Sequence, residues 1–190
     1  ECLCAEDRHF VFDLGRESVG LPLLEFDSDT VQKVTVAWGE DLQGGHVRRV
    51  IEYRDFSFEY VAREGHNRYT NYMFPIGARY MEVFTEAPIR VRYIGLLERY
   101  YPVKRTGIGM DDALDRAIYR LSVRTLELCM FGHYVDTPWR EQCLYAYDAR
   151  NQMLCGYDAF EGGNREYARS NLALIGQDRR EDGLLSICAP

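Results

Sequence analysis

The sequence predicts an α+β protein in two parts: an N-terminal antiparallel β-sandwich over residues 1–105 and a helical part over residues 106–190. Short apolar runs separated by glycines and polar turns fill the first part, a pattern typical of a sandwich or jelly roll. In the second part, apolar residues recur at the spacing of three and four that one helical face requires. A polar link at 104–109, which contains two glycines, separates the two patterns.

The β part contains six candidate strands. Gly15 and Gly20 separate the first two apolar runs, Gly39 ends the third, and Pro88 stands between the last two. The fourth run has the composition of a strand but is interrupted by charges at 54–55. The candidate strands cover residues 10–14, 21–26, 31–38, 47–60, 80–85 and 89–94.

The helical part contains three candidate helices. Asp111 is a suitable N-cap for the first, which we expect to run to about Met130. Thr137 followed by Pro138 indicates the start of the second, since proline suits the first helical position, and we expect its end near Gly156. One face of the first helix collects Leu114, Ala117, Ile118, Leu121 and Thr125.

Asn164 is the expected cap of the third helix, over 165–178. Tyr167, Ala168, Asn171, Leu172 and Ile175 lie along one side of it. Three helices after a sandwich leave apolar stripes that need further partners, and the sequence stops in the apolar stretch 187–190. We therefore expect a piece of a longer protein that associates into homo-oligomers through exposed apolar surface.

Charge and composition exclude several classes of function. The net charge of −7 and pI of about 5.2 argue against a nucleic-acid partner. No apolar run is long enough to span a membrane. The cysteines are expected to be free thiols, which favours a reducing, cytoplasmic location. No cofactor or metal is expected, because Cys2-x-Cys4 lacks a second pair at zinc spacing and the four histidines form no common motif.

A cluster of acidic, basic and aromatic residues lies between 136 and 148. On a helix beginning at Pro138, Glu141 and Asp148 project from the same face, with Tyr145 between them. Carboxylates transfer protons and bind hydroxyls, and aromatic rings stack on sugars, so the cluster favours a glycoside-processing site. The structural alternative is a helix capped by an acid and lined by a solvated charged face. The cluster comprises Asp136, Trp139, Arg140, Glu141, Tyr145 and Asp148.

The stretch Asp136-Thr137-Pro138-Trp139-Arg140-Glu141, followed by Asp148, resembles the catalytic signature of the bacterial α-L-rhamnosidases of glycoside hydrolase family 78. The Asp-to-Glu offset of five and the Glu-to-Asp offset of seven are both reproduced. Thr137 replaces the usual cysteine, and residues 143–147 depart from the usual Arg-x-Gly-Trp-Thr-Gly run. Three upstream phrases, at 13–20, 37–40 and 77–83, are similar to those of the β-sandwich that precedes the family's barrel.

The resemblance implies that the β-sandwich is followed by the first helices of an (α/α)6 six-hairpin barrel. It implies that Glu141 is the general acid, that Asp136 and Asp148 hold sugar hydroxyls, and that Arg140 orients the cluster. Family members invert the anomeric carbon, and the base would lie outside this chain, so the chain alone is expected to be inactive. Two alternatives remain: a non-catalytic carbohydrate-binding sandwich over 10–105, and a six-hairpin glycosidase of another sugar specificity.

Overall fold

A computed structural model describes residues 1–162, 164–177 and 179–189, apart from the side chain of Cys4, and divides the chain into two compact units. The units are Glu1–Arg99 and Tyr100–Pro190. The sequence placed the boundary later, between residues 105 and 106. The link belongs to the second unit because its backbone is bound there: Tyr101 N–H donates to Met130 O and Thr106 N–H to Ala159 O.

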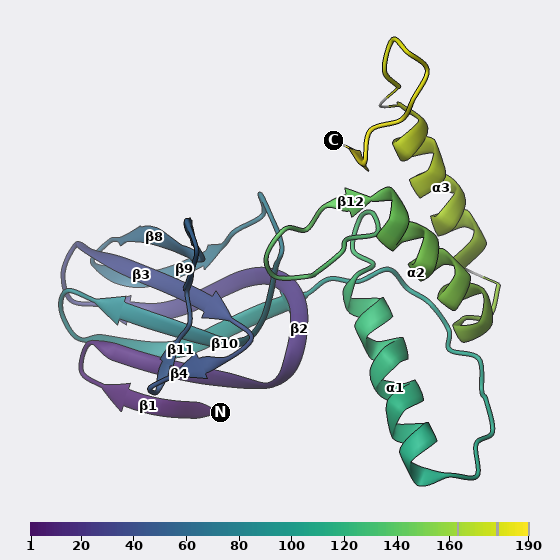
Figure 1. The fold of residues 1–190 in the computed structure, drawn as a ribbon. Helices are drawn as coiled ribbons and strands as arrows, with labels where there is room; N and C mark the ends of the chain where they lie inside the picture. The colour runs from purple at the N-terminus through teal and green to yellow at the C-terminus, as the bar shows by residue number, and fades with distance from the viewer. Residues whose placement is uncertain (163, 178, 190) are drawn as a thin grey trace. The chain divides into compact units, whose positions relative to one another are not determined.

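The first unit is built on one seven-stranded antiparallel sheet (Figure 1). Its main path runs β1 (Cys2–Glu6), β2 (His9–Ser28), β10 (Ile76–Thr85), β3 (Gln32–Gly39) and β8 (Ser57–Ala62). Two further strands, β9 (Gly65–Thr70) and β11 (Ile89–Glu98), also pair with β2. The predicted antiparallel β architecture of the N-terminal part is therefore confirmed.

Strand β2 connects the two layers of the sandwich. Its first half pairs with β1 and β10, and its second half, from Gly20 onward, pairs with β9 and β11. Figure 1 shows the strand bending between these halves. Gly15 adopts a positive φ of 83° at the irregularity, a conformation that glycine reaches without strain. A Cβ on Gly20 would lie 2.3 Å from Leu97 O, so only glycine lets β11 approach so closely.

The core of this unit lies between the two layers. Alternate residues of the central strands point inward, as the two-residue period of a strand requires. Rings from both layers meet there: Phe26 packs edge-on against Tyr60, and Tyr69 packs on the same ring at a centroid distance of 4.9 Å. The fully or almost fully buried apolar residues include Leu24, Phe26, Val34, Val36, Ile76, Met81 and Val83.

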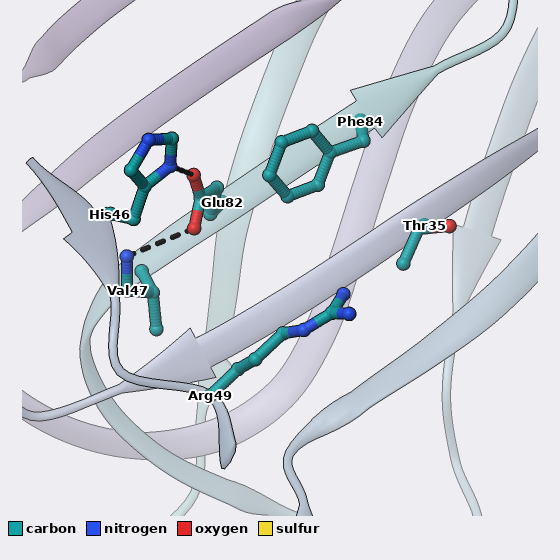
Figure 2. Close-up of a pocket in the computed structure, with 6 residues that line it drawn as sticks. All are labelled: Thr35, His46, Val47, Arg49, Glu82 and Phe84. Carbon is teal, nitrogen blue, oxygen red and sulfur yellow. Dashed lines mark hydrogen bonds and ion pairs between the residues drawn. The ribbon is translucent and has the colours of Figure 1, made fainter.

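Two small hairpins follow β3. The first pairs β4 (Leu42–Gln43) with β5 (His46–Val47), and the second pairs β6 (Val50–Ile51) with β7 (Arg54–Asp55). The first hairpin is tied to the sheet by the Val47 N–H, which donates to the carboxylate of Glu82 on β10 at 2.9 Å (Figure 2). A carboxylate in mid-strand is thereby covered.

The predicted strands differ from those observed in three respects. The runs 10–14 and 21–26 form one strand, because Gly15 and Gly20 bend the chain without ending the ladder. The run 47–60 breaks into four strands at the turns of the small hairpins, where Glu52 has a positive φ of 55°. Sequence patterning missed β1, β4 and β9; β9 reads Gly-His-Asn-Arg-Tyr-Thr and lacks apolar alternation.

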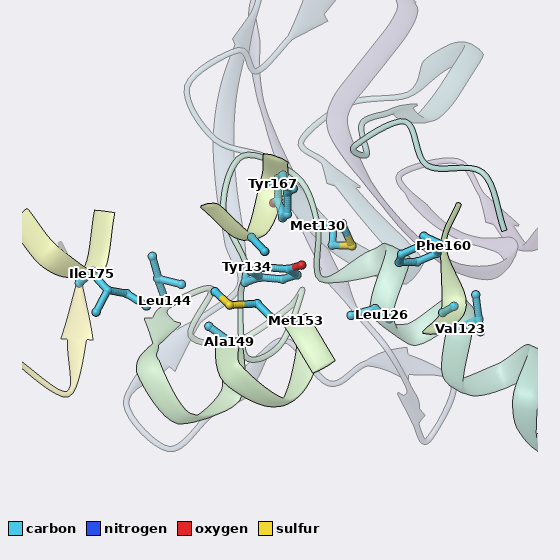
Figure 3. Packing of buried hydrophobic residues seen from close by; sticks show 13 residues of the cluster. Val123, Leu126, Met130, Tyr134, Leu144, Ala149, Met153, Phe160, Tyr167 and Ile175 are labelled. Carbon is cyan, nitrogen blue, oxygen red and sulfur yellow. The ribbon is translucent and has the colours of Figure 1, made fainter. Parts of the chain in front are cut away.

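The second unit contains α1 (Ala113–Leu128), α2 (Ala146–Ala159) and α3 (Asn164–Gln177), with a two-stranded pair of β12 (Leu144–Tyr145) and β13 (Cys188–Ala189). No helix among the described residues has the length and apolarity needed to cross a membrane. The helices share one apolar core, shown in Figure 3. It is formed chiefly by Val123, Leu126, Met130, Tyr134, Leu144, Met153, Phe160, Tyr167 and Ile175.

The apolar face that the sequence indicates on α1 is not the face that packs into the core of this unit. Leu114, Ile118 and Leu121 are 67%, 53% and 69% exposed, and the core instead receives Val123 and Leu126. The helix presents apolar residues on two sides, so periodicity alone cannot decide which side the other helices cover. Its cap is Asp112 rather than Asp111: the Asp112 carboxylate accepts from Leu114 N–H at 2.7 Å and Asp115 N–H at 3.0 Å.

The side of α3 that the sequence indicates is buried at Tyr167, Ala168, Asn171 and Ile175, while Leu172 is exposed. Asp178, the expected end of the helix, lies outside the described residues, and so does Gly163, which precedes the first residue of α3. Residues 188–189 are not an unpaired end, because β13 pairs with β12.

Candidate functional site

The predicted acidic site lies on a closed loop in the second unit. Asp136 N–H donates to Cys143 O at 3.0 Å, and the Asp136 carboxylate accepts from Cys143 N–H at 2.9 Å. A single residue therefore closes both sides of the loop over 136–143. Inside it, the Gln142 side chain donates to Pro138 O at 2.7 Å. The loop is shaped by side chains that satisfy its own backbone.

The prediction that a helix begins at Pro138 is wrong. Residues 138–141 form a turn, and α2 begins only at Ala146. Gln142 has a positive φ of 54°, which a continuing helix excludes. Proline suits the start of a helix, but the bonds of Asp136 and Gln142 to the loop backbone prevail. Glu141 and Asp148 consequently do not share a helical face.

Glu141, the predicted general acid, is partly buried on this loop. Arg140 Nε lies 3.9 Å from Glu141 Oε2, and the Glu141 side chain is about a quarter exposed, at 28%. Its Oε2 atom is shielded from solvent and accepts no hydrogen bond from the residues that the structure describes.

Tyr145 lies close to the acidic residues of the loop. The charge of Cys143 is the main cause that raises the pKa of the Tyr145 phenol, followed by loss of hydration and by the charge of Asp136, with Glu141 contributing least. The structure therefore gathers Asp136, Glu141 and Tyr145, with Cys143 between them in sequence. A neutral phenol beside carboxylates can donate a hydrogen bond to them or to a hydroxyl ligand.

Trp139 and Asp148 are placed differently from the expectation. The Trp139 ring is 4% exposed, so it packs inside the unit, and stacking on a sugar would require the loop to open. Asp148 is exposed in the first turn of α2, where the helix dipole favours its charge. Arg140 is exposed beside Glu141. The roles of these residues stay predictions.

A cavity of about 430 Å³ opens between α1 and α2. Asp136 reaches its wall, which is otherwise mainly apolar and includes Tyr119, Leu126 and Cys129 on the α1 side. Gln152 on α2 lines it and also donates to Val135 O at 2.7 Å, immediately before Asp136. Asp136 thus connects the acidic loop to this hollow.

A buried polar network holds the chain that leads into the loop. Tyr134 is fully buried; its hydroxyl donates to Asn164 Oδ1 at 2.5 Å, and its N–H donates to Asn171 Oδ1 at 2.7 Å. Figure 3 shows the Tyr134 ring between Tyr167 and Met153. Both asparagines belong to α3, so this helix fixes the segment two residues before Asp136.

Sequence reasoning missed a second cluster, which lies in the first unit. Glu82 on β10 is buried, with a side chain 2% exposed. Its Oε1 atom lies 2.6 Å from His9 Nε2 and 2.7 Å from His46 Nδ1. These residues are 73 and 36 positions apart from Glu82, so no local spacing could have revealed them.

Comparison with known proteins places the first unit. Residues 4–95 match the family model described as the bacterial α-L-rhamnosidase concanavalin-like domain. The first unit belongs to this family. The three phrases that suggested it, at 13–20, 37–40 and 77–83, lie side by side on β2, β3 and β10.

Solved structures of α-L-rhamnosidases resemble the whole chain. A family 78 rhamnosidase of Bacillus sp. GL1 is 26% identical, with a TM-score of 0.83 over 100% of this chain and 20% of its own. A Streptomyces avermitilis α-L-rhamnosidase complexed with L-rhamnose is 17% identical, with a TM-score of 0.72 over 100% of this chain and 19% of its own. A Klebsiella oxytoca rhamnosidase with rhamnose bound is 20% identical, with a TM-score of 0.66 over 99% of this chain and 39% of its own. Among curated proteins, none matches the chain.

The chain spans about a fifth of the Bacillus rhamnosidase and a similar share of the Streptomyces enzyme. The likeness supports membership of a glycoside hydrolase family for both units. At sequence identities of 17% and 20%, the Streptomyces and Klebsiella structures support the fold alone. A sugar, a mechanism and catalytic residues for this chain are therefore matters of proposal.

Proposed function

We propose that this chain is part of an inverting glycoside hydrolase that cleaves terminal α-L-rhamnosides, with Glu141 as general acid. The observation that carries the proposal is the likeness to the Bacillus family 78 rhamnosidase, which extends through both units at a TM-score of 0.83. The family match of residues 4–95 supports it independently. In this proposal the three helices are the first of an (α/α)6 barrel, and the partner is a carbohydrate.

The proposed roles follow from the loop that Asp136 closes. Glu141 lies on this loop with a partly exposed side chain, so a leaving-group oxygen can reach it for protonation. Asp136 and Asp148 hold sugar hydroxyls, and Arg140 orients Glu141 through their 3.9 Å ion pair. Tyr145 contributes a neutral phenol at the same place.

Inversion needs a second carboxylate about 6.5–9.5 Å from the acid to activate water on the opposite face of the sugar. The proposal assigns that base to a part of the enzyme outside these 190 residues. The reducing, cytoplasmic location that the cysteine content of the sequence favours stays a prediction.

A chimera tests the assignment of Glu141. The 190 residues would replace the matching segment of the Bacillus rhamnosidase, and hydrolysis of aryl α-L-rhamnosides would be measured. We expect Glu141→Gln to lower kcat by about 100-fold or more on a poor leaving group, and by much less on a dinitrophenyl rhamnoside, because a good leaving group needs little protonation. Glu161→Gln, at an exposed loop glutamate, is the matched control.

Two outcomes of the chimera experiment would contradict the proposal. One is a folded chimera without activity. The other is a Glu141→Gln variant whose loss is the same for both leaving groups, which would indicate misfolding rather than a missing acid. Proton NMR of the first-formed rhamnose tests inversion: the β anomer is expected, and the α anomer would indicate retention.

The alternative of a non-catalytic carbohydrate-binding sandwich has one supporting observation. Tyr72 is 72% exposed and Phe74 41% exposed on the segment between β9 and β10, and such rings can stack on a sugar. Glycan binding by the chain that survives Glu141→Ala but is lost in Tyr72→Ala would favour this alternative. The reverse pattern would favour the hydrolase, with a six-hairpin enzyme of other specificity distinguished by substrate profiling.

A further inference from the structure

The cluster around Glu82 belongs to the first unit, whereas the acidic loop belongs to the second, and the cluster has no role in the proposed hydrolysis. It lies on the outer face of the β2–β10–β3 part of the sheet, where Phe84 sits directly opposite His9 in the antiparallel register. The β4–β5 hairpin brings His46 over the same place (Figure 2). Three strands far apart in the sequence therefore deliver two imidazoles and one carboxylate to one point.

A buried carboxylate on a sheet face is costly unless its charge is compensated. Glu82 Oε2 receives the Val47 N–H, and Oε1 faces both histidines at 2.6 and 2.7 Å. The His9 ring stacks on Phe84 at a centroid distance of 4.7 Å and on His46 at 5.2 Å, which fixes its orientation. The result is an ordered set of donor atoms rather than a solvated charged surface.

The donor atoms of this set match a metal site. His9 Nε2, His46 Nδ1 and a Glu82 carboxylate oxygen all lie within 4.8 Å of one another. Two imidazoles and one carboxylate suit Zn²⁺ and its neighbours in the first transition row, whereas Ca²⁺ and Mg²⁺ prefer oxygen ligands. We propose that His9, His46 and Glu82 bind one divalent transition-metal ion of the Zn²⁺ class.

The surroundings leave room for such an ion. A cavity of about 430 Å³ adjoins Glu82 and His46, and its wall is completed by Thr35, Val47, Arg49 and Phe84 (Figure 2). A tetrahedral ion with bonds of about 2.0–2.1 Å holds its ligands about 3.3 Å apart, so the two imidazoles must withdraw by about 0.6 Å. His46 is 61% exposed on a two-residue strand and is free to make that movement.

Besides this movement, binding requires a change of tautomer. In the metal-free arrangement each imidazole donates the proton that faces Glu82, and on binding that proton moves to the other ring nitrogen: Nδ1 of His9 and Nε2 of His46. Glu82 keeps the Val47 N–H on its second oxygen, so the hairpin stays attached. An ion with three protein ligands would keep a fourth position for water or a small ligand, and the adjoining cavity has room for it.

Cobalt titration of the untagged, chelator-treated chain tests the proposal. Co²⁺ should produce visible d–d absorption with a stoichiometry of one ion per chain, and Zn²⁺ should displace it. No near-ultraviolet sulfur-to-cobalt band should accompany the absorption, because cysteine is absent from this site. At about 100 times the dissociation constant, Zn²⁺ should raise the Tm of the first unit by about 5 °C or more.

His46→Ala should weaken Co²⁺ binding by at least about tenfold. Loss of a residue that merely hydrogen-bonds to a metal ligand already lowers affinity by about that factor, and His46 would be a ligand itself. The matched control is His66→Ala, at a histidine 47% exposed on β9 that pairs with Asp27 and Glu25 and should leave binding unchanged. Glu82→Gln, which keeps the side-chain size, gives a second readout if His46→Ala unfolds.

Three results would overturn the metal site. The first is an unmodified chain that gives no visible band. The second is equal Co²⁺ affinity in His46→Ala. The third is a sulfur-to-cobalt band, which would assign the ion to a cysteine. In each case the three residues would be a hydrogen-bonded clamp for the hairpin and no more.

Discussion

At the scale of single residues, buried and partly buried polar groups decide the local structure of both units. Asp136 closes the acidic loop with two hydrogen bonds to Cys143, and Tyr134 holds the preceding segment through two asparagines of α3. Glu82 does the same for the β4–β5 hairpin. Each of these groups is costly to bury alone and stabilising only with its partners, so their removal should have large effects.

The Tyr134 hydroxyl should contribute measurably to the second unit. Tyr134→Phe leaves the Asn164 Oδ1 atom buried without its donor, and we expect the free energy of unfolding to fall by about 1–3 kcal/mol. Urea unfolding followed by the helical circular dichroism signal measures it, since the helices all belong to this unit. Tyr157→Phe, at a half-exposed tyrosine, should change the value by less than about 0.5 kcal/mol.

The second unit should lose stability at alkaline pH. Burial raises the pKa of both Tyr134 and Tyr167 above the ordinary phenol value of about 10. Below that pH both phenols are neutral whether folded or unfolded, and the full stability is present. Above it the unfolded chain ionises and the folded chain resists, so unfolding becomes easier as pH rises. A Tyr134→Phe variant should show a shallower decline between pH 9 and 11, and an unchanged slope would contradict this.

At the scale of elements, close approach and amphipathic faces determine the packing. Strand β2 serves both layers of the sandwich because Gly15 and Gly20 let it bend while its ladder continues. Helix α1 buries Val123 and Leu126 but leaves a second apolar side in solvent. The packing around β2 is complete within the first unit, whereas α1 exposes an apolar surface that is suited to contact with other protein.

Gly20 should tolerate no side chain. A methyl group there would meet Leu97 O, and β11 would have to move away from β2, so Gly20→Ala should destabilise the first unit by about 1–3 kcal/mol. Gly107→Ala is the control, because a Cβ at that position meets no atom within 4 Å and φ is not positive. Thermal melts that shift equally in the two variants would refute the steric explanation.

The exposed side of α1 should cause self-association. Leu114 and Leu121 are each more than 60% exposed one above the other on the helix, and we expect the chain to form dimers or larger species. The double variant Leu114→Gln, Leu121→Gln should lower the mass measured by light scattering. Leu184→Gln, at a leucine 61% exposed outside the helix, should not. A monomeric unmodified chain would disprove this prediction.

At the scale of the whole molecule, the chain combines two units that each have a core of their own, and it spans about a fifth of the Bacillus rhamnosidase it resembles. A glycosidase that inverts needs two carboxylates placed on opposite faces of one sugar. We propose that one of them is Glu141, in the second unit. The chain should therefore fold without performing the reaction.

The purified chain should not hydrolyse an aryl α-L-rhamnoside. The rate should equal that of Glu141→Gln and of buffer, measured by release of the phenol over several hours. Cooperative unfolding of the same preparation would show that the absence of turnover is not caused by misfolding. Turnover that Glu141→Gln abolishes would place both catalytic carboxylates within these residues.

The sequence by itself determined the β-before-α order, most strand positions and the buried side of α3, because these follow from local periodicity and turn residues. It also showed Asp136 and Glu141 in one short segment, and the resemblance of that segment to a known family suggested their roles. Only the tertiary structure decided that Gln142 and Asp136 form a loop instead of a helix, and which side of α1 is buried, because each depends on partners distant in the sequence. The meeting of His9, His46 and Glu82 depends on strand pairing over 73 and 36 residues, which no local pattern records.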